Sequence, residues 1–227
     1  MPLTLYAHPF ASYCWKTTIA LYENDTPFDF HLVNLGDAAS AAELQKLWPF
    51  KKFPVLVDGD TTVIESSIII EYLDLHYPGA VRLIPTDTAN TTDPANAAAA
   101  LDVRFMDRFF DNYVHTPMQA IVSEAMRGDK RDADVVARAC ATLDIAYAWL
   151  EQRLANRHWA TGEHFSLADC AAAPALFYAD WVHVIGDAYP NVRAYRNRLN
   201  ARPSFARTID EARPYRHYFP LGAPDRD

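Results

Sequence analysis

The fold is decided by the stretch Lys51-Lys52-Phe53-Pro54-Val55-Leu56 and by Glu65-Ser66-Ser67-Ile68-Ile69-Ile70 shortly downstream. Proline cannot donate a hydrogen bond to a strand ladder, so Pro54 is expected to open a strand rather than lie inside one. If the Phe53–Pro54 bond is cis, a state open mainly to X–Pro bonds, the N–H and C=O of Phe53 face away from the sheet. These two groups could then hold the backbone of another peptide.

The downstream motif predicts a helix start that can hold an anion. Ser66 is expected to be the N-cap of a helix that begins at Ser67, so its hydroxyl and the first free N–H groups face outward. Each feature alone is often purely structural, since prolines open strands and serines begin helices in many folds. The spacing of the two motifs indicates a peptide-binding group beside a carboxylate-binding group.

Together with the segment Leu3 to Leu21, these motifs resemble the amino-terminal domain of the soluble, cytosolic-type glutathione S-transferases, with a first helix similar to that of zeta- and theta-like members. The resemblance implies that glutathione is the co-substrate. It also implies that Phe53, beside Pro54, pairs through its backbone with the cysteinyl part, and that Glu65 and Ser66 bind the γ-glutamyl carboxylate and amine. Lys52 is a candidate for the glycyl carboxylate, the alternative being a solvated lysine pair.

Composition indicates a compact enzyme without a nucleic-acid or membrane partner. The chain has 227 residues, 50% hydrophobic and 22% charged, enough for two domains, and its net charge of −8 disfavours binding to phosphate backbones or anionic lipids. No basic-then-apolar leader or apolar run of about 18 residues is present, so a cytoplasmic protein is expected. Three widely spaced cysteines predict reduced thiols, and the scattered histidines predict no metal site.

The order of expected elements is β-α-β-α-β-β-α, followed by helices only, which predicts an α/β thioredoxin-like amino-terminal domain and an all-α carboxy-terminal domain. We assign residues 1–79 to the first domain, 80–92 to a linker rich in proline, threonine and aspartate, and 93–227 to the helical domain. The expected strands are 3–6, 28–33, 55–57 and 62–64, and the expected helices between them are 12–24, 38–47 and 67–76.

In the second domain, an apolar stripe of Leu101, Phe105 and Phe109 predicts a long helix from about Thr92, kinked at Pro117 and ended by Gly128. A second long helix is expected over residues 132–156. Ser166 and Asp169 form a capping box, so this acidic residue is interpreted as structural. In the resembled family the first long helix lines the electrophile pocket, which makes Arg104 and Tyr113 candidate pocket residues.

Ser12 is the candidate for activating the thiol. Half-ionising a thiol of pKa about 8.5 at neutral pH takes roughly 2 kcal/mol. A helix amino terminus supplies only about 0.3–1 kcal/mol, whereas a hydrogen bond to a charged group supplies about 1.5–3 kcal/mol. Ser12 lies at the expected start of the first helix and could supply that bond, the alternative being a plain N-cap serine.

The same loop departs from the family. Alignment on Trp15 places Ala11, which has no hydroxyl, at the usual catalytic serine, and the first cysteine of a glutaredoxin-like motif is missing, which disfavours cysteine-based deglutathionylation. Cys14 is expected to pack beneath the helix rather than react. Tyr6 and Tyr13 also carry hydroxyls and stay open as alternatives to Ser12.

Two functions follow from the resemblance. The first is a detoxification-type glutathione transferase that activates glutathione for attack on a small hydrophobic electrophile. The second is a non-catalytic, glutathione-transferase-like binding or stress-response protein, for which Ala11 would mark lost catalysis. A homodimer is expected in either case.

Overall fold

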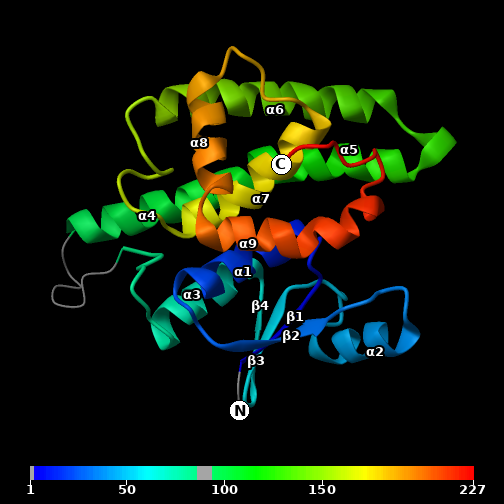
Figure 1. The fold of residues 1–227 in the computed structure, drawn as a ribbon, viewed down its shortest axis with the longest axis vertical. Coiled ribbons are helices and arrows are strands. Elements are labelled where there is room, and N and C mark those ends of the chain that lie inside the picture. Colours follow the sequence, from blue (N-terminus) through cyan, green and yellow to red (C-terminus); the bar gives the residue numbers. More distant parts are fainter. Residues whose placement is uncertain (1–2, 86–93) are drawn as a thin grey trace.

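A computed structural model of the protein describes residues 3–85 and 94–227. The amino-terminal part has the predicted order of elements (Figure 1). Its strands are β1 (Leu3–Ala7), β2 (Phe28–Leu32), β3 (Val55–Asp58) and β4 (Thr61–Ile64), and its helices are α1 (Ser12–Glu23), α2 (Ala38–Leu47) and α3 (Ser66–His76).

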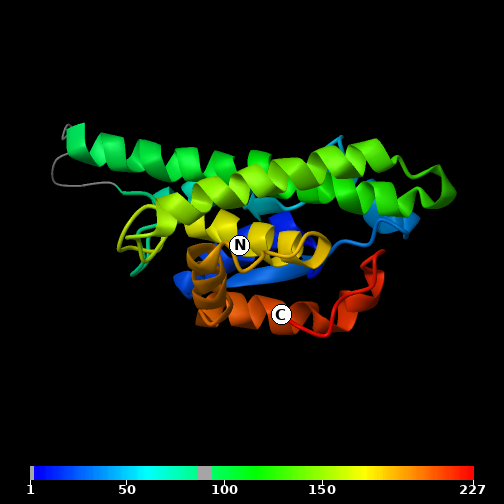
Figure 2. The same cartoon turned by 90° about the horizontal axis from the view of Figure 1, so that it is seen from above.

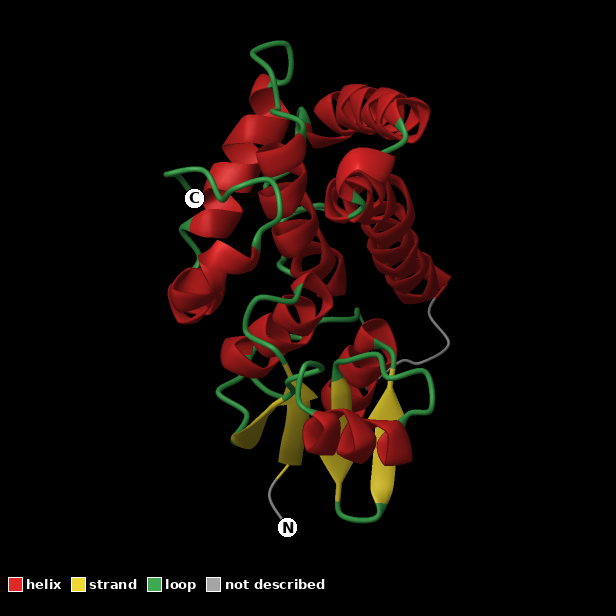
Figure 3. Cartoon of the chain, turned by 90° about the vertical axis from the view of Figure 1, so that its right-hand side faces the viewer, coloured by secondary structure: helices red, strands yellow, loops and turns green. Residues whose placement is uncertain are grey.

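The four strands form one mixed sheet in the order β2-β1-β3-β4. β1 pairs parallel with β2 and antiparallel with β3, and Leu5 lies opposite both Phe30 and Leu56. Alternate residues of β1 are buried, and α1 and α3 pack on that face while α2 packs on the other through Leu44. This layered α/β arrangement is the predicted thioredoxin-like fold (Figure 3).

The rest of the described chain is helical, as predicted. Its elements are α4 (Pro94–Phe109), the π-helical turn η1 (Phe110–His115), α5 (Thr116–Met126), η2 (Gly128–Lys130), α6 (Ala133–Leu154), α7 (Leu167–Val182), α8 (Pro190–Asn200), α9 (Pro203–Ala212) and η3 (Arg213–Tyr218). α6 is the longest of these helices and lies beside α4 (Figure 2). No helix of the described ranges is long and apolar enough to cross a bilayer.

One hydrophobic core joins the two parts of the molecule. Trp15 of α1 is 1% exposed and packs against Phe177, Tyr178 and Phe205, with ring centroids 5.1, 4.9 and 5.6 Å away. Residues Leu167 to Trp181 of α7 are all buried, so this helix is the centre of the second part. The two parts therefore pack together through a shared apolar interior.

Local sequence signals explain where several helices begin and end. Asp169 and Ser166 form the predicted capping box at the start of α7. Gly128, at φ 56°, follows the end of α5 as predicted, because glycine adopts this left-handed conformation without steric cost. A kink is predicted at Pro117; just before that residue the structure has the π-turn η1, in which the N–H of Thr116 bonds to the carbonyl of Asp111, five residues back.

The structure corrects two details. The N-cap of α3 is Glu65 rather than Ser66, which is the first residue of the helix instead. In the stripe on α4, Leu101 and Phe105 are 68% and 46% exposed, and only Phe109 is buried. Most of the predicted linker 80–92, and the predicted helix start near Thr92, fall on residues 86–93, outside the described residues, so these boundaries stay predictions.

Candidate active site

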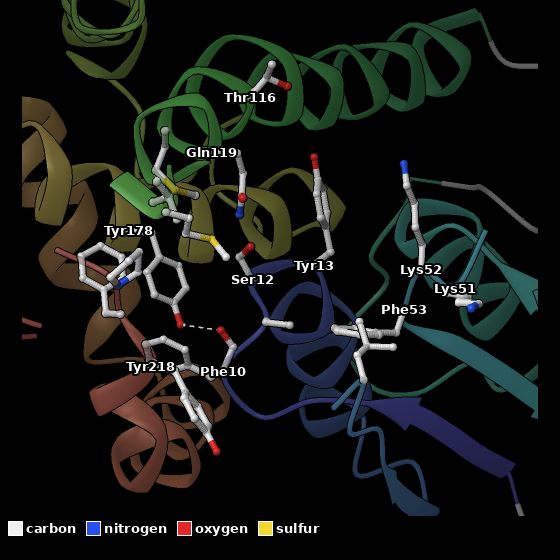
Figure 4. Close-up of a pocket in the computed structure, with 17 residues that line it drawn as sticks. Phe10, Ser12, Tyr13, Lys51, Lys52, Phe53, Thr116, Gln119, Tyr178 and Tyr218 are labelled. Carbon is white, nitrogen blue, oxygen red and sulfur yellow. Dashed lines mark hydrogen bonds between the residues drawn. The ribbon is translucent and has the colours of Figure 1, made fainter. Parts of the chain in front are cut away.

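Two adjoining cavities lie between the thioredoxin-like part and the helices. The apolar cavity has a volume of about 580 Å³ and lies below α5 (Figure 4). It is lined by Phe10, Ala11, Ser12, Tyr13, Leu35, Lys51, Lys52, Phe53, Thr116, Met118, Gln119, Val122, Met126, Tyr178, Tyr218, Phe219 and Pro220. Its walls thus come from the loop before α1, from α5 and from the carboxy-terminal segment.

The polar cavity has a volume of about 200 Å³. It is lined by Tyr13, Trp48, Lys52, Phe53, Pro54, Glu65, Ser66, Ser67, Arg108, Asp111 and Asn112. Tyr13, Lys52 and Phe53 line both cavities, so the two adjoin along these side chains. The structure therefore brings together all five residues that the sequence assigns to a glutathione grip.

Strand pairing explains why the two motifs meet. β3 and β4 are antiparallel with Val55 opposite Ile64, so the residues just before Val55 and just after Ile64 lie at the same end of the hairpin. Pro54 directly precedes β3, and its bond to Phe53 is cis. Glu65 follows β4 with φ 70°, a rare conformation for a residue with a Cβ atom. Such a strained residue is typical of functional sites.

Ser12 lies in the first turn of α1, where Ala11 is the N-cap, and it faces the apolar cavity (Figure 4). Its Oγ is 2.7 Å from Nε2 of His115, which belongs to η1 and is 1% exposed. Burial, with a smaller contribution from Lys16, lowers the pKa of His115 to about 3. This histidine is therefore neutral at physiological pH and carries one ring N–H.

The other candidate donors differ in their surroundings. Tyr13 lines both cavities, and burial raises its pKa to about 12, so it stays a protonated phenol. Tyr6 donates instead to Oε1 of Glu43 on α2, at 3.2 Å. Cys14 is buried, as predicted, and desolvation raises its pKa to about 12, which disfavours a reactive thiolate.

A largely buried ion cluster borders the polar cavity. It consists of Lys16, Ser67, Asp107, Arg108 and Asp111. The Nζ of Lys16 lies 2.5 Å from Asp107 Oδ1 and 2.9 Å from Asp111 Oδ2, and it donates to Ser67 Oγ at 2.9 Å. Arg108 pairs with both aspartates, so the two acidic and two basic groups balance in charge. Desolvation raises the pKa of Asp111, while Lys16 opposes the shift.

Two predicted pocket residues lie elsewhere. Arg104 forms a two-pronged pair with Glu71, at 3.0 and 2.8 Å, on the surface between α4 and α3. Tyr113 is 53% exposed and packs on Phe109. Neither lines either cavity, although Arg108, one helical turn after Arg104, lines the polar one.

Several site residues escape the sequence patterns. No sequence motif assigns His115, Gln119 or Tyr218 to the site, and the sequence around His115 suggests only a buried helix residue. The one feature of the sequence that could have pointed to His115 is its position two residues before Pro117 in a predicted helix. Among the described residues, no group of three or more His, Cys, Asp and Glu side chains is placed to hold a metal ion.

Comparisons with known proteins agree with this geometry. Residues 5–80 match a family model described as "Glutathione S-transferase, N-terminal domain", and residues 109–203 match the corresponding C-terminal domain. The chain is 30% identical to "Glutathione S-transferase 3" of Zea mays, covering 92% of this chain and 93% of that protein. It is 28% identical to a "Probable maleylacetoacetate isomerase" of Vibrio cholerae, covering 94% and 98%.

Among solved structures, the chain is similar to a glutathione S-transferase from Methylobacillus flagellatus KT with glutathione bound. The two share 28% sequence identity and a TM-score of 0.78, over 91% of this chain and 98% of the other. The similarity therefore extends through both parts of the fold.

Proposed function

Because the chain belongs to the glutathione S-transferase family, we propose that it binds glutathione and activates its thiol for attack on a small hydrophobic electrophile. The observation that carries the proposal is the junction of the two cavities. A polar cavity suited to a charged tripeptide adjoins an apolar cavity, and the Ser12 hydroxyl faces the apolar one near this junction (Figure 4).

The proposed roles follow from the chemistry of glutathione, which has an ammonium, two carboxylates and a thiol. Glu65 pairs with the ammonium, and Ser66 at the start of α3 binds the γ-glutamyl carboxylate. The backbone of Phe53 pairs with the cysteinyl unit, and Lys52 lies by the glycyl carboxylate. The thiol is then directed toward the apolar cavity and loses its proton to solvent. The resulting thiolate attacks the electrophile there, and the leaving group departs.

Ser12 is proposed to stabilise the thiolate. We expect Ser12→Ala to raise the pKa of the bound thiol by about one unit, because a hydroxyl hydrogen bond favours the anion over the thiol. A titration of the thiolate absorbance of bound glutathione measures this pKa, and turnover of a panel of electrophiles should fall in parallel.

Cys14→Ala is the matched control and should leave the thiol pKa unchanged. If the pKa is unaffected in Ser12→Ala but rises in Tyr13→Phe or Tyr6→Phe, a tyrosine is the activating group. If the parent protein binds glutathione without forming a thiolate near neutral pH, the alternative of a non-catalytic binding or stress-response protein replaces the enzyme.

We also propose a homodimer. Large apolar side chains are exposed on both parts of the molecule, Leu101 and Ile145 (72%) on α4 and α6, Ile68 (53%) and Leu75 (73%) on α3. In a two-fold symmetric dimer, the apolar residues on the first domain of one subunit can contact those on the helical domain of its partner. The symmetry then repeats this contact, so both apolar surfaces of each subunit are covered.

Sedimentation at micromolar protein should therefore give about twice the monomer mass of 25.6 kDa. Leu101→Glu should shift the protein toward monomer, because the charge must be buried in the interface. Val184→Glu, at another exposed apolar residue (64%), is the control and should not. A parent that sediments at 25.6 kDa contradicts the proposal.

A further inference from the structure

The contact between Ser12 and His115 joins residues that are 103 positions apart in the sequence. His115 is the last residue of η1, and Pro117 just beyond it has no N–H to continue a regular α-helix. The π-turn adds one residue to the helical turn and so changes the direction of the side chains that follow. In this structure it places the ring of His115 against the first turn of α1.

The ring is held firmly in that position. Tyr13 packs on it with centroids 4.0 Å apart and an interplanar angle of 36°. The amide nitrogen of Gln119, one helical turn later, lies 3.3 Å from the same Nε2 that contacts Ser12. Its amide oxygen reaches that position by a half-turn of the group, so Gln119 can act as donor or acceptor there. His115 does not line the cavity itself, so it acts on a ligand through the residues that it contacts there, of which Ser12 carries the hydroxyl at 2.7 Å.

The direction of the Ser12–His115 hydrogen bond decides what the serine can do. If the hydroxyl donates to Nε2, its hydrogen is occupied and its oxygen can only accept from a thiol, which favours the neutral S–H form. If Nε2–H donates to Oγ, the hydroxyl hydrogen is free to point at the sulfur. Hydrogen bonds in such a chain polarise one another, so the hydroxyl becomes a stronger donor to a thiolate.

We propose that His115 is a positioning residue whose Nε2–H donates to Ser12 Oγ and so directs the hydroxyl hydrogen at the sulfur of bound glutathione. This inference rests on the proposed function, since it assigns a task to His115 in the same site. The low pKa of this histidine keeps the ring neutral near pH 7, so the N–H donor does not change with protonation there. The arrangement compensates for Ala11, which supplies no hydroxyl of its own.

The test compares His115→Phe with His115→Gln by the thiolate absorbance of bound glutathione as a function of pH. Phenylalanine keeps a ring beside Tyr13 but has no donor, whereas a glutamine amide can place an N–H near the position of Nε2. We expect His115→Phe to raise the pKa of the bound thiol by up to about one unit, which lowers the ratio of thiolate to thiol roughly tenfold. In His115→Gln, the pKa should stay close to that of the parent. In a Ser12→Ala background, His115→Phe should have no further effect.

The affinity for S-methylglutathione, which has no thiol, should be unchanged in both variants and reports on the integrity of the site. If His115→Phe does not fold, His115→Asn takes its place, because its shorter amide leaves the Nε2 position without a donor. An unchanged or lower thiol pKa in the variant that lacks the donor overturns the inference, as does an equal rise in the Ser12→Ala background. A parent that forms no bound thiolate overturns this inference together with the proposed function, whereas a parent with a thiolate and an inert His115 overturns this inference alone.

Discussion

Lys16→Met is expected to lower the free energy of unfolding by about 3–5 kcal/mol, because it leaves two buried carboxylates without their cation. Lys16 is 1% exposed, and Asp107 and Asp111 are 2% and 6% exposed. Arg108 would remain, but its side chain is 54% exposed and is shared between both aspartates. The remaining acidic pair would then repel in a medium that screens charge poorly.

Chemical denaturation of the two proteins measures the change. Arg104→Met is the matched control, since it removes a cation from a more exposed ion pair with Glu71. Its free energy of unfolding is expected to fall by only about 0–1 kcal/mol. Adding Asp111→Asn to Lys16→Met should recover part of the loss, because it removes one of the uncompensated charges. Equal losses in Lys16→Met and Arg104→Met would show that the buried ion cluster adds no more to the free energy of unfolding than an exposed ion pair.

The thioredoxin-like part of the fold is predictable from the sequence because its signals are local. Alternation in β1 and the proline before β3 each act within a few residues of their position, as does the glycine after α5 in the helical part. The apolar stripe on α4 shows the limit of such signals. Periodicity locates Leu101 and Phe105 on one face of a helix, but it does not distinguish a core from a surface that another subunit can cover.

The candidate site likewise has residues that local sequence patterns predict and residues that only long-range packing brings together. The motifs that meet at the polar cavity are close in sequence and are joined by one hairpin, so their spacing is informative. Ser12 and His115 come together only through packing of α1 against η1, and Phe10 meets Tyr178 across 168 positions, where its carbonyl accepts a hydrogen bond at 3.0 Å. No local pattern encodes contacts of this range. Ser66 was misplaced by one residue because Glu65 adopts a positive φ that the sequence does not favour.

Glu65→Ala and Ser66→Ala are each expected to weaken glutathione binding by about 10- to 150-fold, since each removes a hydrogen bond to a charged group worth about 1.5–3 kcal/mol. Glu65 is exposed in the free protein, so its carboxylate is available to the ligand ammonium, and Ser66 is 7% exposed at the start of α3, where a carboxylate is favoured. Binding is measured by calorimetry and by retention on immobilised glutathione. Glu71→Ala is the control, because Glu71 lies further along α3 and pairs with Arg104 outside the cavity.

Conservative substitutions at Glu65 and Ser66 should restore glutathione binding to different extents. Glu65→Gln keeps a hydrogen-bond acceptor but loses the charge, so it should bind glutathione between the parent and Glu65→Ala, whereas Ser66→Thr keeps the hydroxyl and should stay close to the parent. The thiol pKa of the glutathione that still binds should not move in any of these variants, because the polar cavity holds the γ-glutamyl end and Ser12 acts on the sulfur. Equal binding by the parent, Glu65→Ala and Ser66→Ala, or no binding by the parent, would remove the polar cavity from the glutathione site.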